Sequence, residues 1–341
     1  MNKNRQPEVV VITGASAGIG RATVRAFAQR GAHLGLLARG QEGLEGARQE
    51  AEKLGGQAIV IPTDVADHDQ VERAAITIEE TFGPIDIWIN NAMVSVLSPV
   101  KDMTAEEFQR VTNVTYLGYV YGTLTALRRM LPRNRGVIIQ VGSALSYRAI
   151  PLQSAYCGAK HAVKGFTESL RSELIHDKSK VRITMVHLPG VNTTQFGWIK
   201  SRMPYHPQPV PPMYQPEVMA RAIVWAADHD RRELWVGMPT VKTIVGEKFI
   251  PGLLDHYLAD VAYSGQQTNV PVDPHRPNNL LTPVAEDRGA HGPFDHRSRS
   301  SSLQLWASMN RGWLAVAGVG CLLSLGWARM QSQVNRSRLN D

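Results

Sequence analysis

The sequence lacks several features that would point to common classes of protein. Its 341 residues contain only two cysteines, Cys157 and Cys321, which excludes a disulfide-rich scaffold and fits a reducing compartment. The formal charge of +7 is spread along the chain without a Lys/Arg block, so we expect no nucleic-acid partner. The histidines after residue 255 do not have metal-ligand spacing, so no metal site is predicted. The first residues run into an apolar strand without a signal-peptide pattern, so we expect the N-terminal part in the cytoplasm.

What the chain does contain is an alternation of short apolar runs and segments of helical periodicity, from roughly residue 8 to residue 235. The apolar runs lie at residues 8–12, 32–37, 57–61, 85–89, 137–141, 181–187 and 234–236. Continuous apolar runs are typical of strands buried on both faces of a parallel sheet. The alternation therefore predicts an α/β fold with a doubly wound parallel sheet, the Rossmann fold.

A glycine-rich turn follows the first apolar run. The sequence Thr13-Gly14-Ala-Ser-Ala-Gly18-Ile-Gly20 joins this predicted strand to a helical segment. Glycines let the backbone approach a dinucleotide diphosphate, and the helix N-terminus offers free N–H groups. An ordinary glycine-rich turn is the less favoured alternative, because three glycines stand at this spacing at a strand-to-helix junction. The residues assigned to cofactor binding here are Gly14, Ser16, Gly18, Ile19 and Gly20.

The second predicted strand ends in Ala38-Arg39, where an NAD-binding unit usually carries an acidic residue for the ribose hydroxyls. A guanidinium suits a 2′-phosphate instead, so the sequence favours NADP(H) over NAD(H). A solvated surface arginine is the alternative. Asp64-Val65 follows the third strand, where the carboxylate could bond an adenine amine or cap the helix that begins near Asp67.

Polar residues also follow the fourth strand, at Asn90-Asn91. Their amides could brace the neighbouring backbone and reach a ribose, or form a plain Asx turn. A long helix is predicted from about residue 104 to residue 131, and it contains Asn113 among apolar neighbours. A buried amide needs partners, and spacing alone leaves open a role in the core or on the surface.

The stretch from Ser143 to Lys160 carries the chemistry. Ser143 lies just past the strand at 137–141, and Tyr156 and Lys160 are four residues apart in a predicted helix, on one face. An ammonium beside a phenol lowers the phenol pKa, which makes the pair a plausible acid/base device for carbonyl–alcohol interconversion, with the Ser143 hydroxyl bonding the reacting oxygen. Alone, a Tyr and a Lys at this spacing are more often a half-buried ring beside a solvated charge.

Taken together, these motifs resemble those of the short-chain dehydrogenase/reductase family over roughly residues 8–235. The matching residues are Thr13, Gly14, Gly18 and Gly20, Asn90-Asn91-Ala92-Met93, Asn113, Ser143, Tyr156, Lys160, and Pro189-Gly190. The resemblance implies that Tyr156 donates or accepts the proton and Ser143 orients the carbonyl. It implies that Lys160 binds the nicotinamide ribose and lowers the tyrosine pKa, and that Asn113 anchors a water in the proton relay.

The resemblance also implies cofactor contacts and shows one departure. Arg39 stands at the NADP-selecting position and Asp64 at an adenine contact, with Val65, Asn91, Pro189 and Gly190 as further cofactor-binding residues. Met93 replaces the last glycine of the family's NNAG motif, and a side chain there cannot adopt positive φ cheaply. We interpret Met93 as a subfamily feature. A Pro-rich stretch at 203–216 is interpreted as a lid or substrate loop.

The C-terminal part is different in composition. We divide the chain into a catalytic domain at 1–263, a polar linker at 264–302 and a membrane-associating segment at 303–341. The segment contains an uncharged apolar run at 312–328, about 25 Å long as a helix and flanked by Trp313 and Trp327. A buried or docking helix is the alternative, and flanking arginines do not decide whether this helix spans the membrane or lies on it.

These observations predict an NADP(H)-dependent oxidoreductase that interconverts a carbonyl and a secondary alcohol on a small, apolar or lipid-like substrate. Membrane association with the catalytic domain in the cytoplasm is expected, and a homo-oligomer is left open. One alternative is a membrane-tethered dinucleotide-binding scaffold or redox sensor without turnover. Another is a tether that carries a degenerate enzyme domain. An intact Ser143, Tyr156 and Lys160 argues against the scaffold, whereas deletion of residues 303–341 would test the tether.

Overall fold

The computed structural model describes residues 7–273 and 275–314. The chain divides into two compact units, residues 1–302 and 303–341. All features below belong to the first unit unless stated otherwise.

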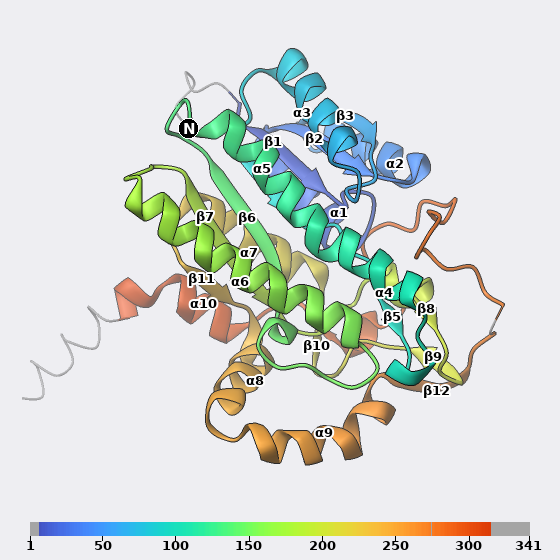
Figure 1. The fold of residues 1–341 in the computed structure, drawn as a ribbon. Coiled ribbons are helices and arrows are strands. Elements are labelled where there is room, and N and C mark those ends of the chain that lie inside the picture. The colour runs from blue at the N-terminus through green and yellow to red at the C-terminus, as the bar shows by residue number, and fades with distance from the viewer. Residues whose placement is uncertain (1–6, 274, 315–341) are drawn as a thin grey trace, which may run out of the picture. The chain divides into compact units, whose positions relative to one another are not determined.

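A seven-stranded parallel sheet forms the centre of the first unit (Figure 1). Its strands are β1 (Val9–Thr13), β2 (His33–Ala38), β3 (Gln57–Pro62), β4 (Ile87–Asn90), β6 (Val137–Ser143), β7 (Arg182–Leu188) and β11 (Glu233–Trp235). Their order is β11-β7-β6-β4-β1-β2-β3, so the direction of winding reverses between β1 and β4. In open α/β sheets, ligands bind at such a switch point, beyond the carboxyl ends of the strands.

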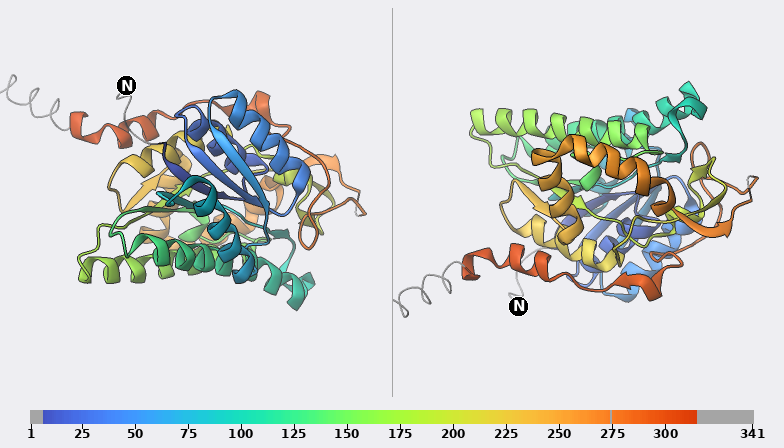
Figure 2. Two further views of the ribbon diagram at one scale, coloured as in Figure 1. Left: turned by 90° about the horizontal axis from the view of Figure 1, so that it is seen from above. Right: turned by 90° about the horizontal axis from the view of Figure 1, so that it is seen from below.

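Helices cover both faces of the sheet, and their mutual contacts define two layers (Figure 2). One layer contains α1 (Gly18–Ala28), α2 (Gln41–Lys53) and α7 (Pro216–Asp228), and the other contains α3 (His68–Phe82), α5 (Gly118–Met130) and α6 (Ser154–His176). The core lies between the sheet and these layers, and residues such as Val11 and Trp88 are fully buried there. The predicted doubly wound α/β fold is confirmed.

Smaller elements surround the carboxyl ends of the strands. The helices are α4 (Ala105–Thr112), which runs through a π-helical turn (Asn113–Leu117) into α5, and α8 (Gly237–Phe249) and α9 (Pro251–Gly265). The short strands are β5 (Val96–Leu97), β8 (Lys200–Ser201), β9 (Tyr205–Pro207), β10 (Met213–Tyr214), β12 (Gln267–Pro271) and β13 (Ser298–Arg299). The predicted helix at 104–131 begins with a capping box between Thr104 and Glu107, which satisfies backbone donors at its start.

Residues 264–302, which we describe above as a polar linker, lie in the same compact unit as the sheet. Three of their apolar side chains, Leu280, Ala290 and Phe294, are almost fully buried. Strand β12 pairs with β9, and β13 pairs with β10. The polar composition of this segment conceals these few apolar anchors, and burial of such side chains is what holds a segment to a core.

The second unit begins with α10 (Leu303–Met309). Within the part of the chain that the structure describes, no helix has both the length and the apolar character needed to cross a membrane. Most of the apolar run predicted at 312–328 lies outside the described residues.

Candidate active site

A cavity of about 710 Å³ lies at the carboxyl ends of the strands, where the sheet order reverses. Its walls come from the segments that follow β1, β2, β3, β4, β6 and β7, together with α8, α9 and residues 279–288. We call the part around Ser143 and Tyr156 the catalytic end and the part around Arg39 and Asp64 the Arg39 end.

The glycine turn after β1 is built for close approach. Gly14 and Gly18 have φ values of +67° and +55°, which side chains rarely adopt, and a Cβ at Gly20 would collide with the Gly14 carbonyl oxygen. The N-cap residue of α1, Ala17, offers no capping side chain, so the first turn keeps backbone donors for a ligand. Ser16 and Ile19 also line the cavity.

Asn91 braces this turn from β4. Its side-chain amide donates to the carbonyl oxygens of Thr13 at 2.9 Å and Gly14 at 3.3 Å. Asn90 points away into the core, where its amide bonds Gln140 at 3.0 Å. Of the two asparagines, the structure therefore brings Asn91 to the cavity.

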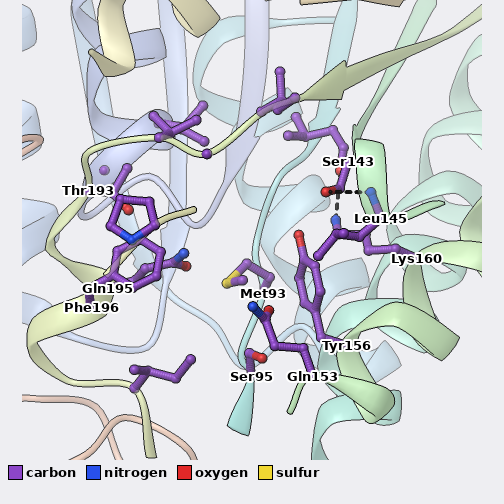
Figure 3. A pocket seen from close by; sticks show the side chains of 18 of the residues that line it. Met93, Ser95, Ser143, Leu145, Gln153, Tyr156, Lys160, Thr193, Gln195 and Phe196 are labelled. Carbon is purple, nitrogen blue, oxygen red and sulfur yellow. Dashed lines mark hydrogen bonds between the residues drawn. The ribbon is translucent and has the colours of Figure 1, made fainter. Parts of the chain in front are cut away.

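Ser143 and Tyr156 face the cavity together (Figure 3). Ser143 is the last residue of β6, and its hydroxyl oxygen accepts a hydrogen bond from the Leu145 amide at 3.1 Å. Tyr156 comes from the first turn of α6, and its hydroxyl points toward Ser143. Burial raises the pKa of Tyr156, and a hydrogen bond to Ser143 partly opposes this shift. The spacing of Tyr156 and Lys160 predicts a lowered pKa for Tyr156, and the structure differs from this prediction.

Lys160 explains the difference. Its side chain is buried, and its ammonium donates to the Tyr119 hydroxyl at 2.8 Å and to the Val141 carbonyl oxygen at 2.7 Å. Burial lowers the pKa of Lys160 to about 7, so its amine holds a proton less firmly near neutral pH than an exposed lysine does. The Lys160 nitrogen also lies 5.7 Å from the centre of the Tyr156 ring. A lysine amine that is less readily protonated lowers the pKa of a neighbouring phenol less.

Asn113 opens the π-helical turn between α4 and α5, and its carbonyl oxygen accepts the Gly118 amide. The hydrogen bonds of residues 7–273 and 275–314 include none between its side chain and Ser143, Tyr156 or Lys160. The relay through Asn113 stays a prediction.

Two residues beside the catalytic end carry no signal in the sequence. Tyr119 lies on α5 and holds Lys160 from the side opposite to the cavity, donating its own proton to Val141 at 3.0 Å. His187 lies on β7, fully buried, with Nδ1 3.1 Å from the Ser143 carbonyl oxygen. Burial lowers the pKa of His187 to about 4, so its imidazole is neutral at pH 7. Their partners come from other strands and helices, so local spacing could not identify them.

At the Arg39 end, the Asp64 carboxylate is engaged by protein groups. One oxygen bonds the Arg110 guanidinium at 2.6 Å, and the other accepts the Ala66 amide at 3.0 Å. The cap of α3 is Asp67, which accepts from the amides of Asp69 and Gln70. Asp64 and Val65 still line the cavity, so the adenine contact stays a prediction.

The remaining predicted residues line the cavity as well. Pro189 and Gly190 follow β7, and a Cβ at Gly190 would collide with the Val210 carbonyl oxygen. This close approach brings the Pro-rich stretch, including Val210, against the cavity. Met93 lies on the wall near Tyr156 (Figure 3). No group of three or more His, Cys, Asp or Glu residues within the described ranges could hold a metal ion.

Comparison with known proteins agrees with this arrangement. The family model for the short chain dehydrogenases matches residues 8–203. A Bacillus subtilis protein described as the uncharacterized oxidoreductase YxnA is 34% identical over 302 residues, covering 87% of this chain and 85% of its own. A fatty acyl-CoA reductase from Acinetobacter baylyi is 32% identical over 226 residues, covering 66% of this chain and 74% of its own.

Among solved structures, an alcohol dehydrogenase from Thermococcus sibiricus in complex with 5-hydroxy-NADP superposes with a TM-score of 0.59 at 28% identity. The match covers 68% of this chain and 96% of that one. The chain belongs to the short-chain dehydrogenase/reductase family. It is an oxidoreductase with the nucleotide-binding Rossmann fold of that family.

Proposed function

We propose that this protein is an NADP(H)-dependent oxidoreductase that interconverts a carbonyl and a secondary alcohol on an apolar substrate. The observation that carries the proposal is that the Ser143 and Tyr156 hydroxyls face the same cavity as the glycine turn after β1. A reacting oxygen and a dinucleotide can therefore meet in one space.

The residues present fit a dinucleotide. The glycine turn and the uncapped start of α1 offer backbone donors for a diphosphate, and Arg39 offers a guanidinium for a 2′-phosphate. When bound, NADP(H) supplies or accepts the hydride. The residues proposed to hold it are Gly14, Ser16, Gly18, Ile19, Gly20, Arg39, Asp64, Val65, Asn91, Tyr156, Lys160, Pro189 and Gly190.

The chain's own residues would move the proton. In the reducing direction Tyr156 donates its phenolic proton to the carbonyl oxygen of the substrate, and in the oxidising direction its phenolate accepts the proton from the alcohol. The Ser143 hydroxyl orients the same oxygen. Because burial raises the pKa of Tyr156, the phenol keeps its proton near neutral pH, which suits donation to a carbonyl.

The cavity wall supports an apolar substrate. The cavity lining includes many aliphatic and aromatic side chains, among them Ile150, Phe196, Ile199, Leu258 and Val261. Such walls bind apolar groups and leave the few polar ones to fix orientation. One relative of the chain is described as a fatty acyl-CoA reductase, and this likeness supports a long-chain carbonyl as the first compound to test.

The proposal is tested by replacing Tyr156 with Phe. We expect turnover of NADPH with long-chain ketones to fall by roughly 10²–10⁴-fold, because general acid catalysis contributes that much, while NADPH binding changes little. Tyr205→Phe is the matched control, since Tyr205 is exposed and lies outside the cavity lining. Undiminished turnover in Tyr156→Phe would contradict the assignment and leave the binding scaffold as the better account.

Membrane association, with the catalytic domain in the cytoplasm, is a second part of the proposal. It is supported by the uncharged apolar run at 312–328 and its terminal tryptophans. Flotation with phospholipid vesicles should carry the full chain but not a chain that ends at residue 302. If both chains stay behind, the run is not a membrane anchor.

A further inference from the structure

Residues 279–289, which we call the strap, lie along the Arg39 end of the cavity. In Figure 1 they belong to the orange trace that passes α4 and α2. The strap residues that line the cavity are Asn279, Pro283, Val284, Glu286 and Arg288. Leu280 is buried beside Val65 and Val111 and anchors the start of the strap. The C-terminal segment is therefore part of the wall of the dinucleotide cavity.

The strap occupies the donors of Arg39 with neutral acceptors. The Arg39 guanidinium donates to the carbonyl oxygens of Leu281 at 2.7 Å and Leu280 at 3.3 Å, and it also bonds that of Asn279. These are the donors that a 2′-phosphate would use, because an arginine binds phosphate through its paired N–H groups. Uncharged carbonyl oxygens stand where an anion would bind.

The charges around Arg39 do not balance. Burial lowers the pKa of Arg39, and the nearby positive charge of Arg110 lowers it further. The Asp64 carboxylate pairs with Arg110 at 2.6 Å, and no carboxylate of residues 7–273 or 275–314 forms an ion pair with Arg39. Two guanidinium groups thus share one carboxylate, which leaves an excess positive charge that favours a phosphate over a carbonyl oxygen.

At its other end, the strap also occupies a hydrogen-bond donor of the glycine turn with one of its carbonyl oxygens. The Gly289 carbonyl oxygen accepts the amide of Gly18, the first residue of α1, at 3.1 Å. An amide at this position is one that a dinucleotide diphosphate would use. The Asp287 carboxylate fastens this end by bonding the buried Arg21 guanidinium at 3.1 Å and 3.2 Å.

We propose that the strap is a specificity-determining element of the cofactor site. Its carbonyl oxygens bind the N–H groups that would otherwise bond the cofactor phosphates, and only an adenosine 2′-phosphate displaces the strap from Arg39. The inference rests on the proposed NADP(H) function. A dinucleotide that carries the 2′-phosphate takes over the Arg39 guanidinium and loosens the strap. NAD(H) offers only hydroxyls there, so it leaves the strap bound to Arg39. At the glycine turn, competition from the strap weakens both cofactors. At Arg39 only NADP(H) has to displace the strap, and it can do so because charge-assisted bonds to its phosphate are stronger than bonds to carbonyl oxygens.

Hydrogen–deuterium exchange of the full-length wild-type protein tests the proposal directly. Peptides that cover residues 279–289 are followed without ligand and with saturating NADP+, NAD+, 2′,5′-ADP or ADP. We expect NADP+ and 2′,5′-ADP to speed exchange in these peptides severalfold, whereas NAD+ and ADP leave it unchanged or slower. Exchange that is equal or slower with NADP+ than with NAD+ would overturn the proposal and make the strap a fixed wall.

Asp287→Asn adds a test by affinity, because it weakens the bond to Arg21 that fastens the strap. We expect this variant to bind NADP+ severalfold more tightly than the wild type does. Asp228→Asn is the matched control, since Asp228 forms an exposed ion pair with Arg30 at 3.0 Å, away from the cavity. Weaker NADP+ binding by Asp287→Asn would show that the strap supports the cofactor instead of competing with it.

The two proposals fail in different ways. Equal affinity of the wild type for NADPH and NADH would contradict the NADP(H) preference, whatever the strap does. A clear preference for NADPH with no difference in strap exchange between NADP+ and NAD+ would keep the proposed function and remove the strap from it.

Discussion

The catalytic end of the cavity takes Ser143, Tyr156 and Lys160 from a single strand–loop–helix stretch, whereas the Arg39 end combines residues that are about 240 positions apart in the chain. At the catalytic end the hydroxyls of Ser143 and Tyr156 are open to a ligand. At the Arg39 end the main donors are already bonded to the strap. The two ends of one cavity therefore differ in how they are assembled and in how ready they are to bind.

This difference separates the residues that act on the substrate from the residues that select the cofactor. Groups that act on the reacting oxygen lie on β6 and α6, rigid elements whose geometry follows from the fold. Groups that choose the cofactor are held by a segment with little secondary structure, which can move at lower cost. The predictions below test each side of this division.

Lys160→Met should have the largest effect. It removes the ammonium beside Tyr156 and should lower turnover by roughly 10²–10⁴-fold, the range for general acid–base catalysis, as measured by NADPH absorbance. Lys164→Met is the matched control one turn further along α6, where Lys164 pairs with Glu168 at 2.9 Å. If the two variants lose activity equally, the effect comes from the helix and not from the catalytic end.

Arg39→Ala should have an intermediate effect, which is confined to cofactor affinity at the Arg39 end of the cavity. It removes charge-assisted bonds to a phosphate, which are worth about 1.5–3 kcal/mol, so NADPH affinity should fall by roughly 10–150-fold while NADH affinity stays nearly the same. Fluorescence titration measures both. Arg48→Ala, which breaks exposed pairs with Glu45 and Glu52 on α2, is the control, and a loss of NADH affinity in Arg39→Ala would contradict the phosphate assignment.

The pH dependence of stability should show the smallest effect for each step of one pH unit. Burial lowers the pKa of Lys160 from 10.5 to about 7, so between these values the unfolded chain binds a proton that the folded chain does not. Stability therefore rises with pH in this window. The cost of burying Lys160 is complete below pH 7 and is lost as pH approaches 10.5.

Urea unfolding gives the free energy of unfolding of the wild type and of Lys160→Met, and the difference between the two measures the contribution of Lys160. The advantage of Lys160→Met should shrink as pH rises from 7 to 10, on the order of 1 kcal/mol per pH unit. A difference that does not change with pH would mean that Lys160 keeps an ordinary pKa in the folded protein.

The sequence predicted the parts of the molecule that depend on local patterns. The strand Val9–Thr13 is apolar up to its last residue because both of its faces are covered, and Gly14 and Gly18 are glycines because the backbone has positive φ there. Tyr156 and Lys160 could be placed on one face of a helix because a helix fixes the relation of residues four apart.

The rest depends on contacts between distant segments. No spacing connects Tyr119 with Lys160 or His187 with Ser143, because each pair joins different elements. The segment at 264–302 has the composition of a linker, and its attachment rests on a few side chains such as Leu280. The lowered pKa of Lys160 follows from complete burial, which the sequence of α6 alone does not reveal.

The position of the strap in the chain means that it is synthesised well after the residues it binds. Asn279 follows Arg39 by 240 residues, and ribosomes add roughly 5–20 residues per second. The donors of Arg39 and of the first turn of α1 are thus made roughly 10–50 s before the carbonyl groups that later cover them, given that rate. The walls of the cavity that come from residues 91–265 are made within the same interval, so the strap reaches these donors only after most of the cavity has been synthesised.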